Sequence, residues 1–447
     1  MANVALIVLD TLRKESFDRH FEWLPGVRFE SAWSAGGWTV PAHGSLFTGQ
    51  YPSETGVRTT AEWLDYDEAV LAERLSDHGV TTRAFSANAY VAPSFDYDRG
   101  FETFDITWRG RRRESDIFEW GEFISENQGA GPTRFLKAVA ACAASDADTI
   151  ASLKVGLQMK ARDLGLSTFG GYDDGAKEAL ELVESTTFGD DEFLFLNLME
   201  AHSPYQPPAD YRTVDTDESP GIDATVGDGP ETDPADIEQA YEDSVRYLSD
   251  VYQDIFATIA EDFDYVITLG DHGECFGDYG VWAHNHGINP QLAHVPLCVY
   301  RGQDEHRTQH STIGLVDIHR TILDLLSVPS NGTRGQNLLD DPSSQPRLVE
   351  RFGLSENHIV NLESTGLSDS EITDWDATLR GVALPDGGYG WETLSGFETV
   401  GTTLDNSIVR ERLATLVEDL DERQVDRGTT GELDPAIQRR LERLGYA

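Results

Sequence analysis

The stretch that decides the fold of this chain is the apolar run Asp264-Tyr-Val-Ile-Thr-Leu-Gly270, which leads directly into Asp271-His272-Gly273-Glu274. The run has the length and the branched side chains of a buried β-strand. A carboxylate and an imidazole therefore stand side by side where a strand passes into a loop. In open α/β sheets, ligands bind at this end of the strands. The stretch thus predicts a buried strand with a functional site at its end.

Two stretches nearer the N-terminus have a related design. Val4-Ala-Leu-Ile-Val-Leu-Asp10 is another apolar run that ends in a carboxylate. In Gly37-Trp-Thr39-Val-Pro41-Ala-His43 a hydroxyl precedes a helix that Pro41 is expected to begin, with Thr39 as a possible N-cap. Together the three stretches offer two carboxylates, one imidazole and one hydroxyl. These groups suit one divalent cation with a nucleophile beside it.

The order of the predicted elements favours an α/β fold. Short apolar runs predict strands, and the segments between them have helical periodicity. Strands that alternate with helices indicate a mostly parallel central sheet with helices on both faces. The expected strands cover residues 4–10, 81–88, 193–200, 264–270 and 295–300, and the expected helices cover residues 41–49, 67–79, 173–186, 235–260 and 314–326.

The length of 447 residues is enough for two or three domains, and we predict two. Residues 1–345 form a large α/β domain, in which residues 105–170 break the pattern and are interpreted as a helical insertion or lid. Residues 346–447 form a small C-terminal α+β subdomain. Within it we expect a hairpin at residues 381–391 and a charged helix at residues 408–446.

Charge is the most unusual property of the composition. Asp and Glu total 79 against 34 Lys and Arg, which gives a net charge of −45. Such a surface either repels polyanions or keeps the protein soluble when salt screens the repulsion between its charges. The second interpretation is favoured, because the composition resembles that of salt-adapted archaeal proteins. Nucleic acid is not an expected partner, since no basic stripe could neutralise phosphates.

Cysteine content and hydropathy bear on the cellular location of the protein. Cys142, Cys275 and Cys298 are too few for a disulfide framework and include no CxxC pair. No stretch approaches the roughly 18 apolar residues of a membrane span, and no charged segment of a signal peptide precedes the first strand. We therefore expect a cytoplasmic location, whereas the sequence does not indicate an oligomeric state.

Together with further elements, these motifs resemble those of the sulfatase family in the alkaline phosphatase superfamily. Val8-Leu-Asp10-Thr-Leu-Arg13 resembles its first metal-binding strand, and Asp271-His272-Gly273-Glu274 matches its second metal motif. Thr39-Val-Pro41-Ala-His43 stands where the family has a Cys/Ser-x-Pro-x-Arg nucleophile motif. Ala201-His202-Ser-Pro204-Tyr205 resembles its His-x-Pro-aromatic element. His286-Gly287 falls where many members carry a substrate-binding Lys or His.

Departures from the family pattern change the expected chemistry. Thr39 cannot become the formylglycine that sulfatases make from Cys or Ser, because its oxidation would give a ketone. Members with Thr here are similar to phosphodiesterases and phosphoglycerol transferases, whose hydroxyl attacks phosphorus directly. His272 replaces the Asn of calcium-binding sulfatases, and an imidazole moves the preference from Ca²⁺ towards Mn²⁺ or Zn²⁺.

The resemblance also implies a role for each candidate residue. One divalent cation, manganese with calcium, magnesium or zinc as alternatives, would be held by Asp10, Asp271, His272 and Thr39. Thr39 would be the nucleophile, while tuned imidazoles would hold substrate oxygens or protonate the leaving group. These imidazoles are His202 and His286, and further substrate contacts are expected from His43, Asn88, Tyr205 and His284.

Three functions stay open at this point. The first is a metal-dependent hydrolase or transferase that cleaves phosphate mono- or diesters through Thr39. The second is sulfate-ester hydrolysis with an unmodified Thr39. In both, the substrate is an anionic ester of a small molecule, a glycan or a lipid headgroup. The third is a non-catalytic protein that binds an anionic glycan or a lipid headgroup.

The net charge of −45 predicts how the protein responds to salt. Repulsion within the acidic surface should weaken as ions screen it, so the midpoint of thermal unfolding should rise from low to molar KCl. Sorbitol at matched osmolality controls for effects of the solute alone. A midpoint that stays flat or falls as KCl increases would refute the screening interpretation.

Overall fold

The computed structural model describes residues 2–107, 137, 142, 174–216, 218–303 and 306–427. The insertion predicted at residues 105–170 therefore lies almost wholly outside the described residues. The same holds for the last part of the helix predicted at residues 408–446. Its first part is confirmed, because a helix, α16, runs from Asn406 to Glu418, but residues 419–427 are not helical.

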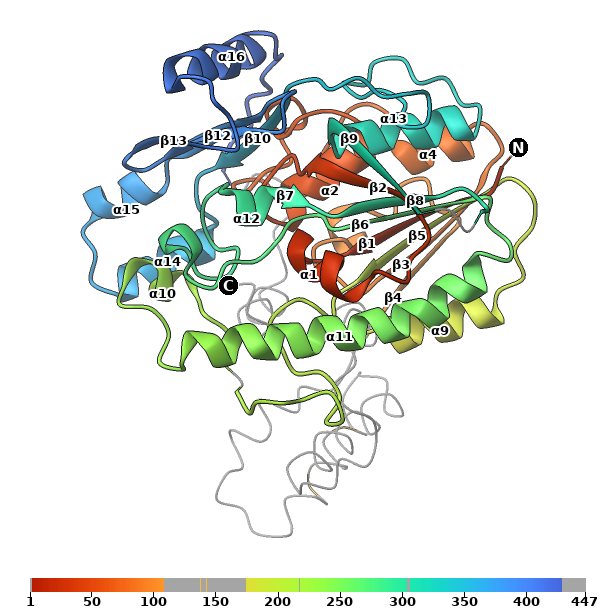
Figure 1. Cartoon of the computed structure of the whole chain (residues 1–447), viewed down its shortest axis with the longest axis horizontal. Coiled ribbons are helices and arrows are strands. Elements are labelled where there is room, and N and C mark those ends of the chain that lie inside the picture. Colours follow the sequence, from red (N-terminus) through yellow and green to blue (C-terminus); the bar gives the residue numbers. More distant parts are fainter. Residues whose placement is uncertain are drawn as a thin grey trace.

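A nine-stranded mixed sheet forms the centre of the molecule (Figure 1). Its strands are β1 (Val4–Leu9), β2 (Gly26–Trp33), β3 (Thr81–Ser86), β4 (Thr103–Ile106), β5 (Glu192–Leu198), β6 (Tyr265–Leu269), β7 (His294–Val295), β8 (Leu297–Tyr300) and β9 (His306–Gly314). They are ordered β4-β3-β5-β1-β6-β8-β2-β7, and β9 also pairs with β2. The first five in this order run parallel, whereas β8 is antiparallel to β6 and β2. The predicted fold class is confirmed.

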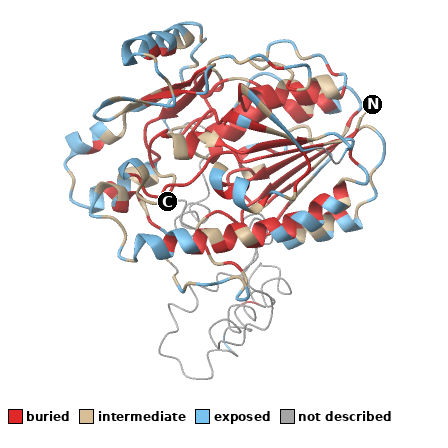
Figure 2. Cartoon of the chain, viewed as in Figure 1, coloured by how far each residue is buried: buried red, intermediate tan, exposed pale blue. Residues whose placement is uncertain are grey.

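Helices cover both faces of this sheet. On one side lie α2 (Thr39–Thr48), α4 (Leu71–Ser76) and α13 (Val316–Leu325), and on the other lie α1 (Lys14–His20), α9 (Ala176–Ser185) and α11 (Pro234–Ile259) (Figure 1). The side chains of β1 alternate between the two resulting cores. Val4, Leu6 and Val8 pack in the first core, while Ala5, Ile7 and Leu9 pack in the second. Figure 2 shows the buried faces of these helices turned towards the sheet.

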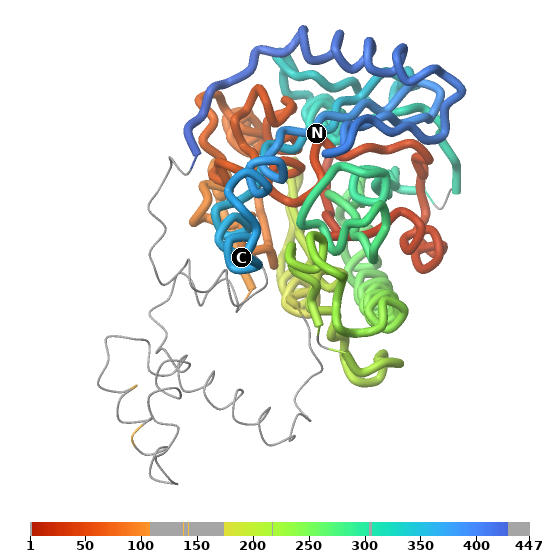
Figure 3. The backbone as a smooth tube through the Cα atoms, turned by 90° about the vertical axis from the view of Figure 1, so that its left-hand side faces the viewer, coloured from red at the N-terminus to blue at the C-terminus, as the bar shows by residue number. Residues whose placement is uncertain are grey.

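The C-terminal subdomain is built on a separate antiparallel sheet. Its strands β10 (Arg347–Phe352), β11 (Thr378–Ala383), β12 (Tyr389–Thr393) and β13 (Gly396–Val400) pair in chain order. Strands β11 and β12 confirm the predicted hairpin, and α14 (Glu356–Ser364), α15 (Asp369–Trp375) and α16 complete the unit. The last described stretch of this subdomain passes beside N-terminal elements (Figure 3), where the Arg423 N–H donates to the Ser53 carbonyl at 2.9 Å. The domain limit at residue 345 remains a prediction, and we keep it because β10 begins two residues later.

Short helices occupy the remaining connections, and three strands of the central sheet were missed. The short elements are α3 (Pro52–Thr55), α10 (Ile222–Val226), α12 (Pro290–Ala293), and the 3-10 turns at Pro93–Phe95 and Asp278–Gly280. Strands β2, β4 and β9 were not predicted, because each carries exposed or half-exposed residues and so lacks a continuous apolar run. Among the described residues, no helix combines the length and apolar character that a membrane span needs.

A buried ion pair joins the C-terminal sheet to α13, a helix that covers the central sheet. The Arg347 guanidinium on β10 donates to Asp317 on α13 at 2.8 and 3.0 Å. Asp317 also accepts from the backbone N–H groups of Gly314 and Gln336, each at 2.8 Å. Both charged side chains are almost completely buried. Each therefore depends on the other for its charge compensation.

Asp317→Asn should destabilise the protein by about 3–5 kcal/mol, because it leaves the buried Arg347 charge without its partner. Asp18→Asn, which breaks a half-exposed pair with Lys14, should cost less than about 1 kcal/mol. Denaturant unfolding of both variants measures the difference. Equally small losses would mean that the contact between the sheets does not depend on the ion pair.

Candidate active site

Strand pairing brings the two predicted metal-binding acids together. Strands β1 and β6 pair in parallel, with Val8 opposite Leu269. Asp10 and Asp271 each follow two residues after this pair, so both lie at the same edge of the sheet. This edge is formed by the carboxyl ends of parallel strands, where ligands bind in such folds.

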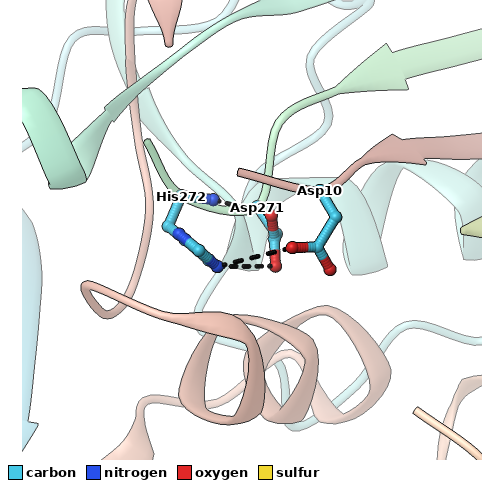
Figure 4. Close-up of side chains that lie close together, drawn as sticks. All are labelled: Asp10, Asp271 and His272. Atoms are coloured by element: carbon cyan, nitrogen blue, oxygen red, sulfur yellow. Dashed lines mark hydrogen bonds and ion pairs between the residues drawn. The ribbon is translucent and has the colours of Figure 1, made fainter. Parts of the chain in front are cut away.

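Asp10, Asp271 and His272 form a compact buried cluster (Figure 4). One ligand atom from each residue lies within 4.8 Å of the others. His272 Nε2 is 3.5 Å from Asp271 Oδ2 and 3.7 Å from Asp10 Oδ1. All three side chains are fully buried. Charged groups are held in this way when they share a compensating charge.

Hydrogen bonds leave the inner atoms of the cluster suited to a cation. His272 Nδ1 donates to the carbonyl of Gly273 at 2.9 Å, so Nε2 carries the lone pair that faces the carboxylates. Asp271 Oδ1 accepts from two backbone N–H groups, whereas Oδ2 has no hydrogen-bond partner within the described residues. Burial and the negative charge of Asp10 raise the pKa of Asp271 well above its usual range. Two carboxylates and one imidazole fit a divalent transition metal.

Thr11 ties the two strand ends together through an uncommon backbone conformation. Its φ of 61° lies in the left-handed region, which a β-branched residue rarely adopts. In this conformation its N–H donates to Asp271 at 3.2 Å and its hydroxyl donates to Asp10 at 2.8 Å. The Tyr241 hydroxyl holds the Thr11 carbonyl at 3.0 Å. The turn therefore fixes the orientation of both carboxylates.

The hydroxyl of Thr39 points into this cluster and does not cap a helix. Helix α2 begins at Thr39 itself and has Trp38 as its N-cap, so the predicted start at Pro41 was wrong. Thr39 Oγ1 lies 3.3 Å from His272 Nε2 and 3.4 Å from Asn88 Nδ2. A hydroxyl in the first turn of a helix lies in the positive potential of the backbone N–H groups.

Asn88 links the hydroxyl to the carboxylates. Its side chain follows the end of β3 and donates to Asp10 Oδ2 at 2.7 Å. Its own oxygen accepts from the backbone N–H of Tyr90 at 2.7 Å, which fixes the orientation of the amide. The structure thus brings together four predicted residues from separate parts of the chain around His272.

Two further histidines line one side of the cluster. The rings of His202 and His284 have centroids 4.9 Å apart, and the His284 ring is 4.6 Å from that of His272. Burial lowers the pKa of His202 to about 4 and that of His284 to about 3. Both imidazoles are therefore neutral near pH 7. His202 Nδ1 donates to the carbonyl of Ser203 at 2.6 Å, which makes Nε2 its proton-accepting nitrogen.

Glu274 orients His284, a contact that the sequence did not predict. Glu274 Oε1 is 3.1 Å from His284 Nδ1, and its other oxygen accepts from the Tyr205 hydroxyl at 2.6 Å. Tyr205 was predicted to contact substrate, but its hydroxyl is buried against Glu274. Burial raises the pKa of Glu274 to about 7.

His43 and His286, for which substrate contacts or a catalytic role are predicted, both contact protein atoms. His43 is a fully buried residue of α2, and its Nδ1 donates to the Thr39 carbonyl while its Nε2 accepts from Asn197, both at 3.0 Å. Both ring nitrogens are thus engaged with protein atoms. His286 Nε2 lies 3.2 Å from the carbonyl of Trp375, and its ring packs on that side chain in the C-terminal subdomain. Asn197 was missed because it lies within an apolar strand.

A model of the family described as Sulfatase matches residues 18–328. The chain belongs to the sulfatase family. The family lies in the alkaline phosphatase superfamily. The match includes Thr39, Asp271 and His272, while Asp10 precedes it. No curated protein matches the sequence.

Solved structures share the fold of this sulfatase-family chain. A phosphonate monoester hydrolase from Silicibacter pomeroyi is 16% identical, with a TM-score of 0.61 over 99% of this chain and 96% of that one. Its counterpart from Agrobacterium radiobacter is 16% identical, with a TM-score of 0.58 over 94% and 92%. A third protein, solved with its substrate D-glucosamine-2-N,6-O-disulfate, is 11% identical, with a TM-score of 0.58 over 94% and 97%. At these identities the likeness establishes the fold.

Removal of one carboxylate tests whether Asp10, Asp271 and His272 form a metal site. Asp271→Asn should abolish binding of Mn²⁺ in calorimetry, because it removes a charged ligand. The metal-free variant should melt at or above the parent's temperature, since two like charges are no longer buried together. Asp264→Asn, at the exposed opposite end of β6, is the matched control and should bind Mn²⁺ as the parent does. Stoichiometric binding by Asp271→Asn would exclude Asp271 as a ligand.

Proposed function

We propose that this protein is a metal-dependent hydrolase or transferase of phosphate esters in which Thr39 Oγ1 is the nucleophile. The observation that carries the proposal is the position of this hydroxyl. It lies 3.3 Å from His272 Nε2, at the N-terminus of α2, and it makes no capping bond. Because Thr39 cannot be converted to formylglycine, direct attack by the hydroxyl is the chemistry open to it. Such attack suits phosphorus.

Asp10, Asp271, His272 and Thr39 Oγ1 are the proposed ligands of one divalent cation. When bound, such a cation supplies a Lewis acid that lowers the pKa of the hydroxyl and screens the charge of the ester. Manganese suits a site of two carboxylates and one imidazole, and zinc, magnesium or calcium are the alternatives. Hence the identity of the ion is itself part of the proposal.

The protein's own groups perform the transfer in two steps. Thr39 Oγ1 attacks phosphorus, the bond to the leaving alcohol breaks, and a phosphothreonine forms. Water or an acceptor alcohol then attacks the same phosphorus and releases Thr39. Protons lost by Thr39 and by the second nucleophile pass to the neutral imidazoles of His202 and His284 and from there to the leaving oxygens.

Other residues hold the reacting groups in place. Asn88 donates towards both Asp10 and Thr39, so it fixes the hydroxyl relative to the carboxylates. The backbone N–H groups in the first turn of α2 can donate hydrogen bonds to the phosphoryl oxygens. His43 and Tyr205 position Thr39 and Glu274 rather than contacting substrate. His286 is not given a catalytic role, because its contacts are with Trp375.

Sulfate-ester hydrolysis is the second candidate. The family and the neighbour bound to a disulfated glucosamine support an anionic ester of this kind. Two esters with the same nitrophenol leaving group, one phosphate and one sulfate, separate the two candidates by their relative kcat/KM. Binding of both without turnover would instead favour the non-catalytic protein.

Substitution of Thr39 tests the proposed nucleophile. Thr39→Ala should lower kcat roughly a thousandfold or more, as when other covalent catalysts lose their nucleophile. Thr39→Ser should keep activity within about tenfold, because the attacking oxygen remains. Thr48→Ala removes another buried hydroxyl of the same helix, one bonded to the Gly44 carbonyl, and should leave kcat unchanged.

Mass spectrometry of a quenched reaction provides the direct readout. A phosphoryl adduct should appear on the peptide that contains Thr39, or an alkylphosphoryl adduct if the substrate is a diester. Turnover of Thr39→Ala near the parent's rate would sink the proposal. It would leave water as the attacking group.

A further inference from the structure

A buried arginine on the C-terminal sheet lies beside the active-site loop. Arg351, on β10, is only 2% exposed. Its Nη2 donates to the backbone carbonyl of Asn285. Its Nε and Nη1 have no hydrogen-bond partner in the part of the chain that the structure describes. Buried polar groups in native proteins are almost always satisfied, and an unpaired buried charge is costly.

The residues around Arg351 connect it to the proposed catalytic centre. Asn285, which receives its hydrogen bond, lies between His284 and His286 in the sequence. The His284 ring packs on the ring of His272, one of the proposed cation ligands. Arg351 therefore contacts the backbone of the residue that directly follows His284 in the chain. Burial, together with the charge of Arg351, lowers the pKa values of His286 and His358 to about 3. These two histidines are thus neutral near pH 7 and do not compete for an anion.

The acid that acts on Arg351 is held by other groups. The negative charge of Asp376 raises the pKa of Arg351, although the two side chains form no hydrogen bond in the described structure. The Asp376 carboxylate instead accepts from Arg427 at 2.5 and 2.7 Å and from the backbone N–H of Leu354 at 2.7 Å. Burial is the larger effect and lowers the pKa of Arg351 to about 10. The guanidinium therefore stays charged at neutral pH. Its Nε and Nη1 groups are left to donate to a ligand.

We propose that Arg351 binds a second oxyanion of the substrate, a carboxylate or phosphate carried on the alcohol part of the ester. This inference rests on the proposed function, because it takes the reacting phosphoryl group to lie at Thr39. A guanidinium is planar and offers several N–H donors, which suits the oxygens of a carboxylate or phosphate. The C-terminal sheet thereby supplies substrate selectivity to a site built on the central sheet.

The location of Arg351 favours a second group over the reacting one. Thr39, Asn88 and the cation ligands already surround the expected phosphoryl position. Arg351 contacts none of these residues and instead donates to the backbone carbonyl of Asn285, next to His284. A substrate with one charge would leave Arg351 without an anion, whereas a doubly charged substrate would satisfy both sites.

Equilibrium binding of non-hydrolysable phosphonates tests this second site. In calorimetry with Mn²⁺ at fixed KCl, the Kd of the parent protein is measured for propylphosphonate, 3-phosphonopropionate and propane-1,3-bisphosphonate. At least one doubly charged probe should bind about tenfold or more tightly than propylphosphonate, a difference of about 1.4 kcal/mol. Tighter binding of 3-phosphonopropionate would indicate a carboxylate site, and tighter binding of propane-1,3-bisphosphonate would indicate a phosphate site.

Arg351→Gln should remove this preference while the Kd of propylphosphonate changes less than about twofold. Arg351→Lys keeps the charge but loses the planar geometry, so it should retain only part of the preference. It carries the test if Arg351→Gln fails to fold. Arg380→Gln is the matched control, because it removes a charge from the neighbouring strand β11 where Arg380 is paired with Glu350. This control should bind all three probes as the parent does.

Other outcomes overturn the inference in distinct ways. Equal weakening of all three probes by Arg351→Gln would place Arg351 on the reacting group itself. Unchanged binding in both Arg351 variants, or a parent that shows no preference for a doubly charged probe, would reduce Arg351 to a structural residue. A parent that binds none of the probes, propylphosphonate included, would instead overturn the proposed phosphate-ester site and this inference with it. Since no probe is turned over, these results are independent of whether Thr39 is the nucleophile.

Discussion

The site depends on one constraint, the burial of two carboxylates at adjacent ends of parallel strands. Pairing of β1 with β6 sets Asp10 beside Asp271, and full burial removes the water that would otherwise screen them. Two like charges in this setting repel strongly unless a positive charge lies between them. His272 Nε2 faces the carboxylates with its lone pair, and Asp271 Oδ2 accepts no hydrogen bond from the described residues. Both observations are consistent with a positive charge bound between the acids. The fold and the proposed chemistry thus follow from the same strand pairing.

Neighbouring elements act by fixing what faces this pair. The turn at Thr11 holds the carboxylates, His43 and Asn197 hold the start of α2, and Glu274 holds His284. Arg351 adds a contribution from the second sheet, whose strand β10 is joined to α13 by the Arg347–Asp317 pair. Hence a change in the C-terminal subdomain can alter the site without replacing any of the proposed cation ligands.

The sequence predicted the parts of the fold and site that local pattern determines. Apolar runs marked β1 and β6, so the positions of Asp10 and Asp271 at strand ends followed directly. Strands β2, β4 and β9 were not predicted, because their partly exposed polar side chains interrupt the apolar pattern. Whether His43 faces substrate or core, and which group Tyr205 contacts, depends on packing between distant segments. Arg351 and Asn197 were missed for the same reason, because each gains its partner only through the fold.

A crystal structure of the protein with Mn²⁺, with the anomalous signal of manganese measured, tests the buried-carboxylate site most directly. One anomalous peak should lie within about 2.0–2.3 Å of a carboxylate oxygen of Asp10, an oxygen of Asp271 and His272 Nε2. The Thr39 hydroxyl should complete the set. A peak at another position, or none at saturating Mn²⁺, would contradict a cation shared by these two acids.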